Sequence, residues 1–399
     1  MIKERTLNFQ TVALALGSGA AQVLVAVLYI FTARGMRPDE YGFVVTAIVL
    51  GFIGAGFIDF GSTPYWIREL ASGRVTLEQL RPGMATKFII ACAVAVLVTL
   101  LAAFKDPNFI ATGILLLSST TVIIVLVPLR AARRAHAVGV LMALDRTVAV
   151  IAYFALVSFG VELGQALWIS IAVGDLLLVI YVIKSEFPQF FRFSFRELHN
   201  PWSGAKWYSL NAFGVSASLL DLPLLSLLAG ASAAGIYGGV NRWAQPMILA
   251  ATSFASAAAP FLAAQSDLRG ARSQVLRASW MLAIVIALGV GAILAAPRLV
   301  IFVLGDAYAS SASVLQWLGG ATILNAIAQP LLVALMSRQF DRLASIIFTA
   351  AVGTQLSIVA VLATTLGAVS AAIGIFVSQS LQVLGSAVCI AVISRRRRI

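Results

Sequence analysis

The chain has 399 residues, of which 60% are hydrophobic and 11% are charged, and its mean hydropathy is +0.97. This composition excludes an ordinary soluble domain. Its 28 Lys and Arg residues outnumber the 16 Asp and Glu residues, which leaves a net charge of +12. What this charge is for depends on where the basic residues lie along the chain.

Twelve apolar stretches follow one another along the chain. Each is near the length of about 20 residues that a helix needs to cross about 30 Å of hydrocarbon. They are too long and too evenly apolar to be the strands of a membrane barrel. The sequence therefore predicts an all-α polytopic membrane protein with twelve transmembrane helices. The predicted spans are 11–33, 42–64, 88–104, 109–129, 138–160, 166–183, 208–230, 236–262, 279–296, 312–336, 344–363 and 370–393.

The basic residues predict the orientation of these helices. Of the 28, 22 lie in gaps on the same side as the N-terminus, four lie in the other gaps, and two lie within spans. By the positive-inside rule, both termini are therefore cytoplasmic. The run Arg395–Arg398 directly follows a span, so its expected partners are anionic lipid headgroups and not nucleic acid. The inner set is Lys3, Arg5, Arg68, Arg74, Arg81, Lys87, Arg130, Arg133, Arg134, Lys184, Arg192, Arg196, Lys206, Arg269, Arg272, Arg277, Arg338, Arg342 and Arg395–Arg398.

Several short patterns recur at half the length of the chain. Their offsets are 196, 200 and 202 residues. Six spans are an even number, so two six-helix lobes would enter the membrane in the same direction and be related by a pseudo-two-fold axis along its normal. The predicted domains are an N-terminal lobe 1–183, a cytoplasmic amphipathic linker 184–207 and a C-terminal lobe 208–399. The recurring residues are Tyr41-Gly42 with Tyr237-Gly238, Pro64 with Pro260, Asp106 with Asp306, and Pro128-Leu129 with Pro330-Leu331.

The loops and the reactive residues argue against an enzyme. The longest predicted outer loop, 297–311, has 15 residues, which is too short for a folded catalytic domain. Cys92 and Cys389 lie inside apolar runs, while His136 and His199 are isolated from any Cys cluster. No phosphate-binding glycine loop occurs. The sequence predicts no catalytic residue, no metal site and no cofactor.

The second span and its flanks carry a family resemblance. Residues 32–70 read TARGMRPDEYGFVVTAIVLGFIGAGFIDFGSTPYWIREL, and this stretch resembles the opening of the Wzx-type oligosaccharide flippases. Residues 230–247 and 304–318 are similar to segments of that family's second half, and Asp221 lies where the family often has an Asp in its seventh helix. The matching positions in the first stretch are Ala33, Arg34, Pro38, Glu40, Tyr41, Gly42, Asp59, Gly61, Arg68, Glu69 and Leu70.

This resemblance implies the fold of the multidrug/oligosaccharidyl-lipid/polysaccharide exporter (MOP) superfamily. It implies translocation of a polyprenyl-diphosphate-linked oligosaccharide from the inner to the outer leaflet of a bacterial or archaeal cytoplasmic membrane. The product would serve the assembly of cell-surface polysaccharide, for example lipopolysaccharide. The expected partners are the lipid-linked oligosaccharide, membrane lipids and other membrane proteins of glycan assembly. Two similar lobes with short loops are typical of alternating access.

Three alternatives share parts of this pattern. A multidrug cation antiporter has the same fold, but carboxylates should dominate its cavity, whereas this chain offers charges of both signs. A membrane-embedded glycan polymerase or ligase would carry a large external loop. A degenerate member that only scaffolds a glycan-assembly complex would not move a labelled lipid-linked sugar.

Cationic groups inside or beside the spans are the candidates for binding the diphosphate headgroup. The planar fork of Arg donates paired hydrogen bonds to phosphate. Arg242, beside Asn241, and Arg34, at the end of the first span, are the two main candidates. Arg146 is a third candidate and directly follows Asp145. The alternative roles are snorkelling for Arg242, interaction with the helix dipole for Arg34 and local pairing for Arg146.

Other polar residues within the spans suggest further roles. Asp59, Asp175 and Asp221 are candidates for coupling transport to H⁺ or Na⁺, because a buried carboxylate can bind either cation. The alternative is that these residues are structural partners of Arg or of backbone amides. Asn325 and Gln329 lie four residues apart, on one face of a helix, where they would bond either sugar hydroxyls or a neighbouring helix.

Overall fold

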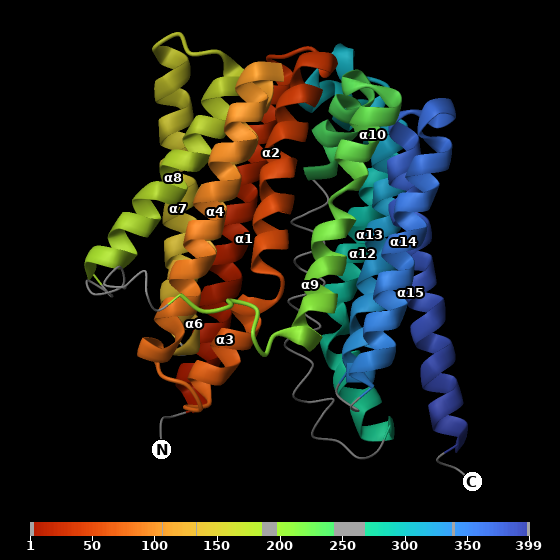
Figure 1. Ribbon diagram of the computed structural model, residues 1–399. Coiled ribbons are helices and arrows are strands. Elements are labelled where there is room, and N and C mark those ends of the chain that lie inside the picture. The colour runs from red at the N-terminus through yellow and green to blue at the C-terminus, as the bar shows by residue number, and fades with distance from the viewer. Residues whose placement is uncertain are drawn as a thin grey trace. The chain divides into compact units, whose positions relative to one another are not determined.

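The structure of the protein is a computed structural model (Figure 1), and it describes residues 4–105, 107–132, 134–185, 198–242, 268–336 and 340–396. The described residues are almost entirely helical and contain no strand. Ten helical segments among them are long and apolar enough to cross a bilayer. Many large apolar side chains on these helices are exposed, among them Phe104, Leu294 and Val361, as expected for surfaces that face lipid. The chain is therefore a multi-pass membrane protein.

Contacts between Cα atoms divide the chain into two compact units. The first unit combines Met1–Met36 with Phe43–Pro223, and the second combines Arg37–Gly42 with Leu224–Ile399. This division differs from the predicted lobes in two segments. Residues 37–42 belong to the second unit, and the beginning of the predicted C-terminal lobe belongs to the first.

In the first unit, helices that are neighbours in sequence pack side by side, and so do helices that are distant in sequence. Helix α1 lies along α7, α7 lies along α8, and α5 contacts both α4 and α8. A short helix, α3, packs against α6 and α9. The helices of this unit are α1 (Glu4–Arg34), most of α2 (Pro38–Asp59), α3 (Ser62–Ala71), α4 (Leu77–Lys105), α5 (Ile110–Val125), α6 (Val127–Ala131), α7 (Ala135–Ser158), α8 (Leu163–Ser185), α9 (Lys206–Ser218) and the first residues of α10 (Asp221–Ala229).

The second unit is built from long helices and from helical residues 231–242. Helix α13 packs against α12, α14 and α15, and α14 also packs along α15. Gly230, with φ +87°, ends α10 in the left-handed conformation that favours glycine. The long helices are α12 (Leu268–Leu304), α13 (Ser311–Met336), α14 (Asp341–Leu366) and α15 (Ala368–Arg396).

The ten segments confirm ten of the predicted spans. The tenth predicted span, 312–336, is not one of these ten; it corresponds to the helix α13, whose 26 residues extend about 39 Å at 1.5 Å per residue. The eighth span, 236–262, lies mostly outside the described residues, as does the central part of the linker 184–207. A total of twelve spans and the symmetry of two lobes stay predictions.

Three predicted spans are not continuous helices. The second, 42–64, is interrupted at Phe60 and Gly61, which have φ values of +40° and +75°. The fourth is divided into α5 and α6, and the seventh into α9 and α10. Hydropathy does not register such breaks, because apolar residues continue through them.

The first turn of α2 makes a backbone-to-backbone contact within the second unit. A Cβ atom placed on Gly42 would lie 1.8 Å from the carbonyl oxygen of Ala231, and one on Gly235 would lie 1.8 Å from that of Pro38. Tyr41 and Tyr308 meet edge to face beside this contact, with ring centroids 6.2 Å apart. Glycine at both positions is therefore required for this close approach.

We expect Gly42→Ala to lower the free energy of unfolding by about 1–3 kcal/mol, because the added methyl group would meet backbone atoms that cannot move aside independently. The matched control is Gly353→Ala in the interior of α14, where an added Cβ meets nothing within 4 Å. There the same change should stabilise by about 0.5–1 kcal/mol through helix propensity. Unfolding by SDS titration in mixed micelles measures both, and equal effects would contradict the close contact.

Candidate functional site

Buried charge is concentrated in the first unit. Among the described residues, the buried charged ones are Lys87, Asp145, Asp175 and Asp221, and all four belong to that unit. Ionisable groups at this depth cost several kcal/mol unless they are paired or solvated. The buried polar side chains described in the second unit are instead uncharged, such as Asn325 and Gln382. The charged interior therefore forms the candidate site.

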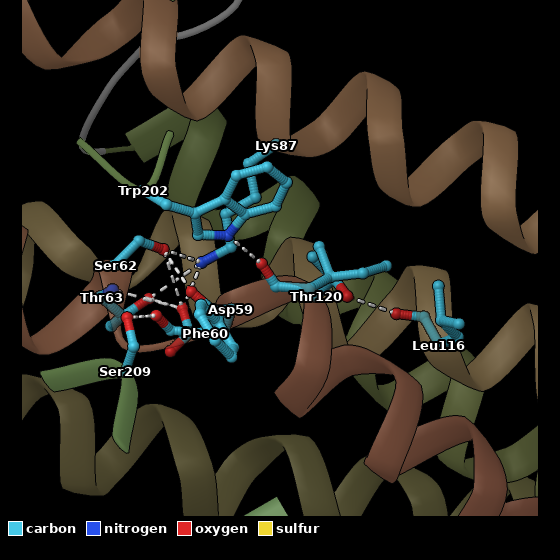
Figure 2. Close-up of polar contacts among 10 residues, drawn as sticks. Asp59, Phe60, Ser62, Thr63, Lys87, Leu116, Thr120, Trp202 and Ser209 are labelled. Carbon is cyan, nitrogen blue, oxygen red and sulfur yellow. Dashed lines mark hydrogen bonds and ion pairs between the residues drawn. The ribbon is translucent and has the colours of Figure 1, made fainter. Parts of the chain in front are cut away.

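The first cluster lies at the corner between α2 and α3 (Figure 2). Asp59 is the last residue of α2, and its Oδ1 atom accepts hydrogen bonds from the backbone N–H of Thr63, at 3.2 Å, and from the Thr63 hydroxyl. The Ser62 hydroxyl donates to the backbone carbonyl of Asp59 at 2.7 Å. These bonds satisfy the start of α3, as an N-cap residue would. Asp59 thus holds the two left-handed residues, Phe60 and Gly61, in place.

Lys87 on α4 closes this cluster from the opposite side. Its ammonium group forms an ion pair with Asp59 Oδ1 and donates to the hydroxyls of Ser62, at 3.0 Å, and Thr63, at 3.1 Å. It also lies 4.9 Å from the ring centroid of Trp66, within cation–π range. The side chain of Lys87 is fully buried.

The position of Lys87 corrects the sequence analysis, which assigned this residue to an inner loop. Helix α4 begins at Leu77, eleven residues before the predicted span 88–104. Thr76 and Gln79 form a reciprocal capping box at its start: Thr76 N–H donates to Gln79 Oε1 at 2.9 Å, and Gln79 N–H donates to Thr76 Oγ1 at 3.4 Å. The T-x-x-Q spacing was the signal that sequence reasoning missed.

The second cluster joins three helices in the interior of the first unit. Arg146 on α7 contacts Asp145 Oδ2 through Nε at 3.1 Å and Asp175 Oδ1, on α8, through Nη2 at 2.9 Å. Ser118 on α5 donates to Asp175 Oδ2 at 2.7 Å. Gly174 permits this approach, because a Cβ there would lie 2.5 Å from Asp145 Oδ1. Two carboxylates share one guanidinium, so the fully ionised triad carries a formal charge of −1.

Two of the predicted site residues, Arg146 and Asp175, are therefore in direct contact. Asp145, which was noted only as a neighbour of Arg146, completes the triad, and its Oδ1 atom is buried without a hydrogen-bond partner among the described residues. Asp59 lies in the separate corner cluster. Asp221 is buried at the start of α10, where its Oδ1 accepts a 2.7 Å hydrogen bond from the N–H of Leu222.

The other predicted residues do not join these clusters in the contacts described. Arg34 is exposed at the C-terminal end of α1, and Asn241 and Arg242 are half-buried at the end of helical residues 231–242. In the second unit, the Asn325 amide on α13 donates to Gln379 Oε1 on α15 at 3.2 Å, which is the interhelical role considered for it. Gln329 is half-buried one turn further along α13. Among the described residues, no group of three or more His, Cys, Asp or Glu side chains is placed to hold a metal ion.

No protein-family model matches the chain, and no curated protein matches it. Solved transporters of the MOP superfamily do match its structure. The lipid II flippase MurJ, in an inward closed conformation, aligns with a TM-score of 0.72 and 12% identity over 95% of this chain and 87% of that chain. An inward-facing multidrug resistance MATE family transporter aligns with a TM-score of 0.68 and 13% identity, over 94% of this chain and 96% of that chain. At such identities these matches establish the fold alone.

A third match comes from Pyrococcus furiosus Vc1 (DSM3638). It is a MOP superfamily transporter, and the reverse polarity of its binding pocket suggests that it has a different function. It aligns with a TM-score of 0.61 and 13% identity over 96% of this chain and 95% of that chain. The fold of the chain is therefore that of MOP superfamily transporters, as the resemblance of residues 32–70 implied. The narrower assignment to Wzx-type flippases does not follow from these matches.

Proposed function

We propose that the protein is a flippase that moves a polyprenyl-diphosphate-linked oligosaccharide from the inner to the outer leaflet of a bacterial or archaeal cytoplasmic membrane. The observation that carries this proposal is the likeness to the lipid II flippase MurJ, with a TM-score of 0.72 across nearly the whole chain. The resemblance of residues 32–70 to oligosaccharide flippases supports it independently. The activity is transport by alternating access, without chemical conversion of the substrate.

In this proposal, Arg34 and Arg242 bind the diphosphate. Arg34 is exposed and Arg242 is half-buried, so neither side chain is enclosed within its helix bundle. Arg146 is held by two carboxylates, and only 19% of its side chain is exposed. It therefore serves the triad better than it serves a passing anion. Asn241, Asn325 and Gln329 would offer hydrogen bonds to the sugar.

The same proposal assigns ion coupling to the buried carboxylates. Asp175 shares Arg146 with Asp145, so a proton or Na⁺ that neutralised one carboxylate would remove the formal excess of negative charge in the triad. Asp59 and Asp221 are engaged at the ends of helices, where they bond backbone N–H groups. Asp175 is consequently the strongest of the three predicted coupling residues.

A multidrug cation antiporter is the second candidate function. The observation that favours it is the pair of buried carboxylates, Asp145 and Asp175, on a fold that MATE family transporters share.

Deleting the gene and analysing the lipid fraction tests both functions. Loss of surface glycan with accumulation of a diphosphate-linked oligosaccharide supports the flippase. Normal glycan with increased sensitivity to cationic drugs supports the antiporter.

We expect Arg34→Ala and Arg242→Ala each to reduce glycan export at least tenfold, while the protein remains inserted. A charge-assisted hydrogen bond to a phosphate contributes about 1.5–3 kcal/mol, which corresponds to a factor of roughly 10 or more. The matched control is Arg298→Ala, because Arg298 is also an exposed basic residue near a predicted outer helix end. Surface glycan in a complemented deletion strain is the measurement. Export at the level of the control in both variants would remove these two residues from the mechanism.

A further inference from the structure

The seventh predicted span consists of two helices that meet at a turn. Helix α9 ends at Ser218, Leu219 and Leu220 form the turn, and α10 starts at Asp221. The whole of α9 belongs to the first unit, and the division between the units falls at Pro223, two residues after α10 begins. The chain therefore leaves the first unit immediately after this turn.

A small number of polar contacts hold α9 and the residues before it against the α2–α3 corner. The Ser209 hydroxyl donates to the carbonyl oxygen of Phe60 at 2.9 Å, and Arg68 Nη1 donates to the Tyr208 hydroxyl at 2.8 Å. Upstream of α9, Trp202 Nε1 donates to the carbonyl oxygen of Ile58 at 3.0 Å, as Figure 2 shows. The corner contributes Ile58, Phe60 and Arg68 to these three bonds, and all three lie within or next to the turn that Asp59 and Lys87 stabilise.

Glycines at the same corner allow α9 to pack closely against it. A Cβ atom on Gly56 would lie 2.2 Å from Ser216 Oγ, and one on Gly61 would lie 2.5 Å from the carbonyl carbon of Tyr208. Two ring contacts add to this packing: the centroids of Phe57 and Phe213 are 5.7 Å apart, and those of Tyr65 and Tyr208 are 6.3 Å apart. The polar contacts that hold α9 are few, and hydrogen bonds of this kind contribute little net stability.

We propose that α9 is a releasable gate at the inner end of the transport path, docked on the α2–α3 corner and pivoting at the Leu219–Leu220 turn. The inner side is assigned by the basic residues of this region, among them Arg68 and Lys206. The proposal rests on the proposed transport function for its purpose. The docking of α9, however, can be tested whatever the substrate is.

The first test measures the exposure of the docked face. Ser216→Cys is introduced after Cys92 and Cys389 have been changed to Ala, and inside-out vesicles are treated with a membrane-impermeant maleimide. We expect Tyr208→Phe and Ser209→Ala each to raise the labelling rate about twofold to tenfold, since each removes one hydrogen bond that holds α9.

Matched controls are Tyr181→Phe, on an exposed tyrosine, and Ser185→Ala, whose hydroxyl donates to the carbonyl of Tyr181 on its own helix. Both controls should leave the labelling rate unchanged. Equal rates in all four variants would overturn the gate, because the two contacts would then not hold α9 in place.

The second test locks the gate. The Cβ atom of a Gly56→Cys variant would lie 3.2 Å from that of Ser216, close to the separation in disulfides, so oxidation of Gly56→Cys/Ser216→Cys should tie α9 to α2. Export should fall at least tenfold on oxidation and recover on reduction. The control pair Thr99→Cys/Gly113→Cys joins α4 to α5, and its oxidation should leave export unchanged.

The outcomes separate the gate from the proposed substrate. Unimpaired export by the oxidised Gly56→Cys/Ser216→Cys protein would overturn the gate. Labelling that responds to Tyr208→Phe and Ser209→Ala, in a protein that moves no lipid-linked oligosaccharide, would support the gate and reject the substrate.

Discussion

Arg146→Ala is expected to lower the free energy of unfolding by about 3–5 kcal/mol. The change would remove the one cation that contacts both Asp145 and Asp175, and the two carboxylates are 4% and 1% exposed. Of their partners, the Ser118 hydroxyl would remain on Asp175. Unfolding by SDS titration in mixed micelles measures the loss.

Two further variants decide what the loss means. In the triple variant Asp145→Asn/Arg146→Met/Asp175→Asn, the three side chains are uncharged and have nearly the same shape as the originals. We therefore expect its free energy of unfolding to lie within about 2 kcal/mol of the wild-type value. Arg298→Ala removes an exposed Arg and should change stability by no more than about 0.5 kcal/mol. A triple variant as unstable as Arg146→Ala would contradict the view that unpaired charge causes the loss.

The triple variant also tests ion coupling. If Asp175 binds the coupling cation, the stable, neutral triad should no longer support export driven by an H⁺ or Na⁺ gradient. If the triad only holds α5, α7 and α8 together, export should continue at a rate near that of the wild type. Export measured in vesicles with and without each gradient distinguishes these roles.

Removing the charge of Asp59 should lower the free energy of unfolding more than removing the charge of its partner Lys87. Asp59→Asn leaves a fully buried ammonium group without its counter-ion, and we expect it to cost about 3–5 kcal/mol. Lys87→Met should cost less, about 2–3 kcal/mol, because Asp59 is 14% exposed and keeps hydrogen bonds from Ser62 and Thr63. Unfolding measurements on the two single variants test this order.

The double variant Asp59→Asn/Lys87→Met completes a thermodynamic cycle. The side-chain oxygen of Asn at position 59 can still accept the N–H of Thr63, and Met fills the space beside Trp66, so the double variant should lose only about 1 kcal/mol. The double loss should therefore be several kcal/mol smaller than the two single losses together, as expected for residues that are strongly coupled. If the double variant lost as much free energy of unfolding as the two single variants together, the ion pair would not stabilise the corner.

The residues that carry the family resemblance have structural roles in this fold. Gly42 permits the contact of α2 with residues 231–235, and Asp59 and Gly61 form the corner between α2 and α3. Arg68 bonds Tyr208 at the same corner. In this chain, these four residues of the motif therefore serve contacts between helices.

Much of the architecture could be derived from the sequence alone. Hydropathy and length determined the class of the protein, a helical multi-pass membrane protein, and located ten spans that the structure contains. These properties are local, because a helix satisfies its own backbone and needs only about 20 apolar residues in succession. The resemblance of residues 32–70 implied the fold of the MOP superfamily, which the structural matches then bore out.

Only the tertiary structure decided how the charges are used. Asp59 and Lys87 are 28 residues apart, and Arg146 and Asp175 are 29 apart, on different helices in each case. Whether such side chains meet depends on the register and rotation of packed helices, which glycines such as Gly174 set through backbone contact. The sequence by itself therefore determined which residues are costly to bury, and the packing of the helices determined which partner stabilises each of them.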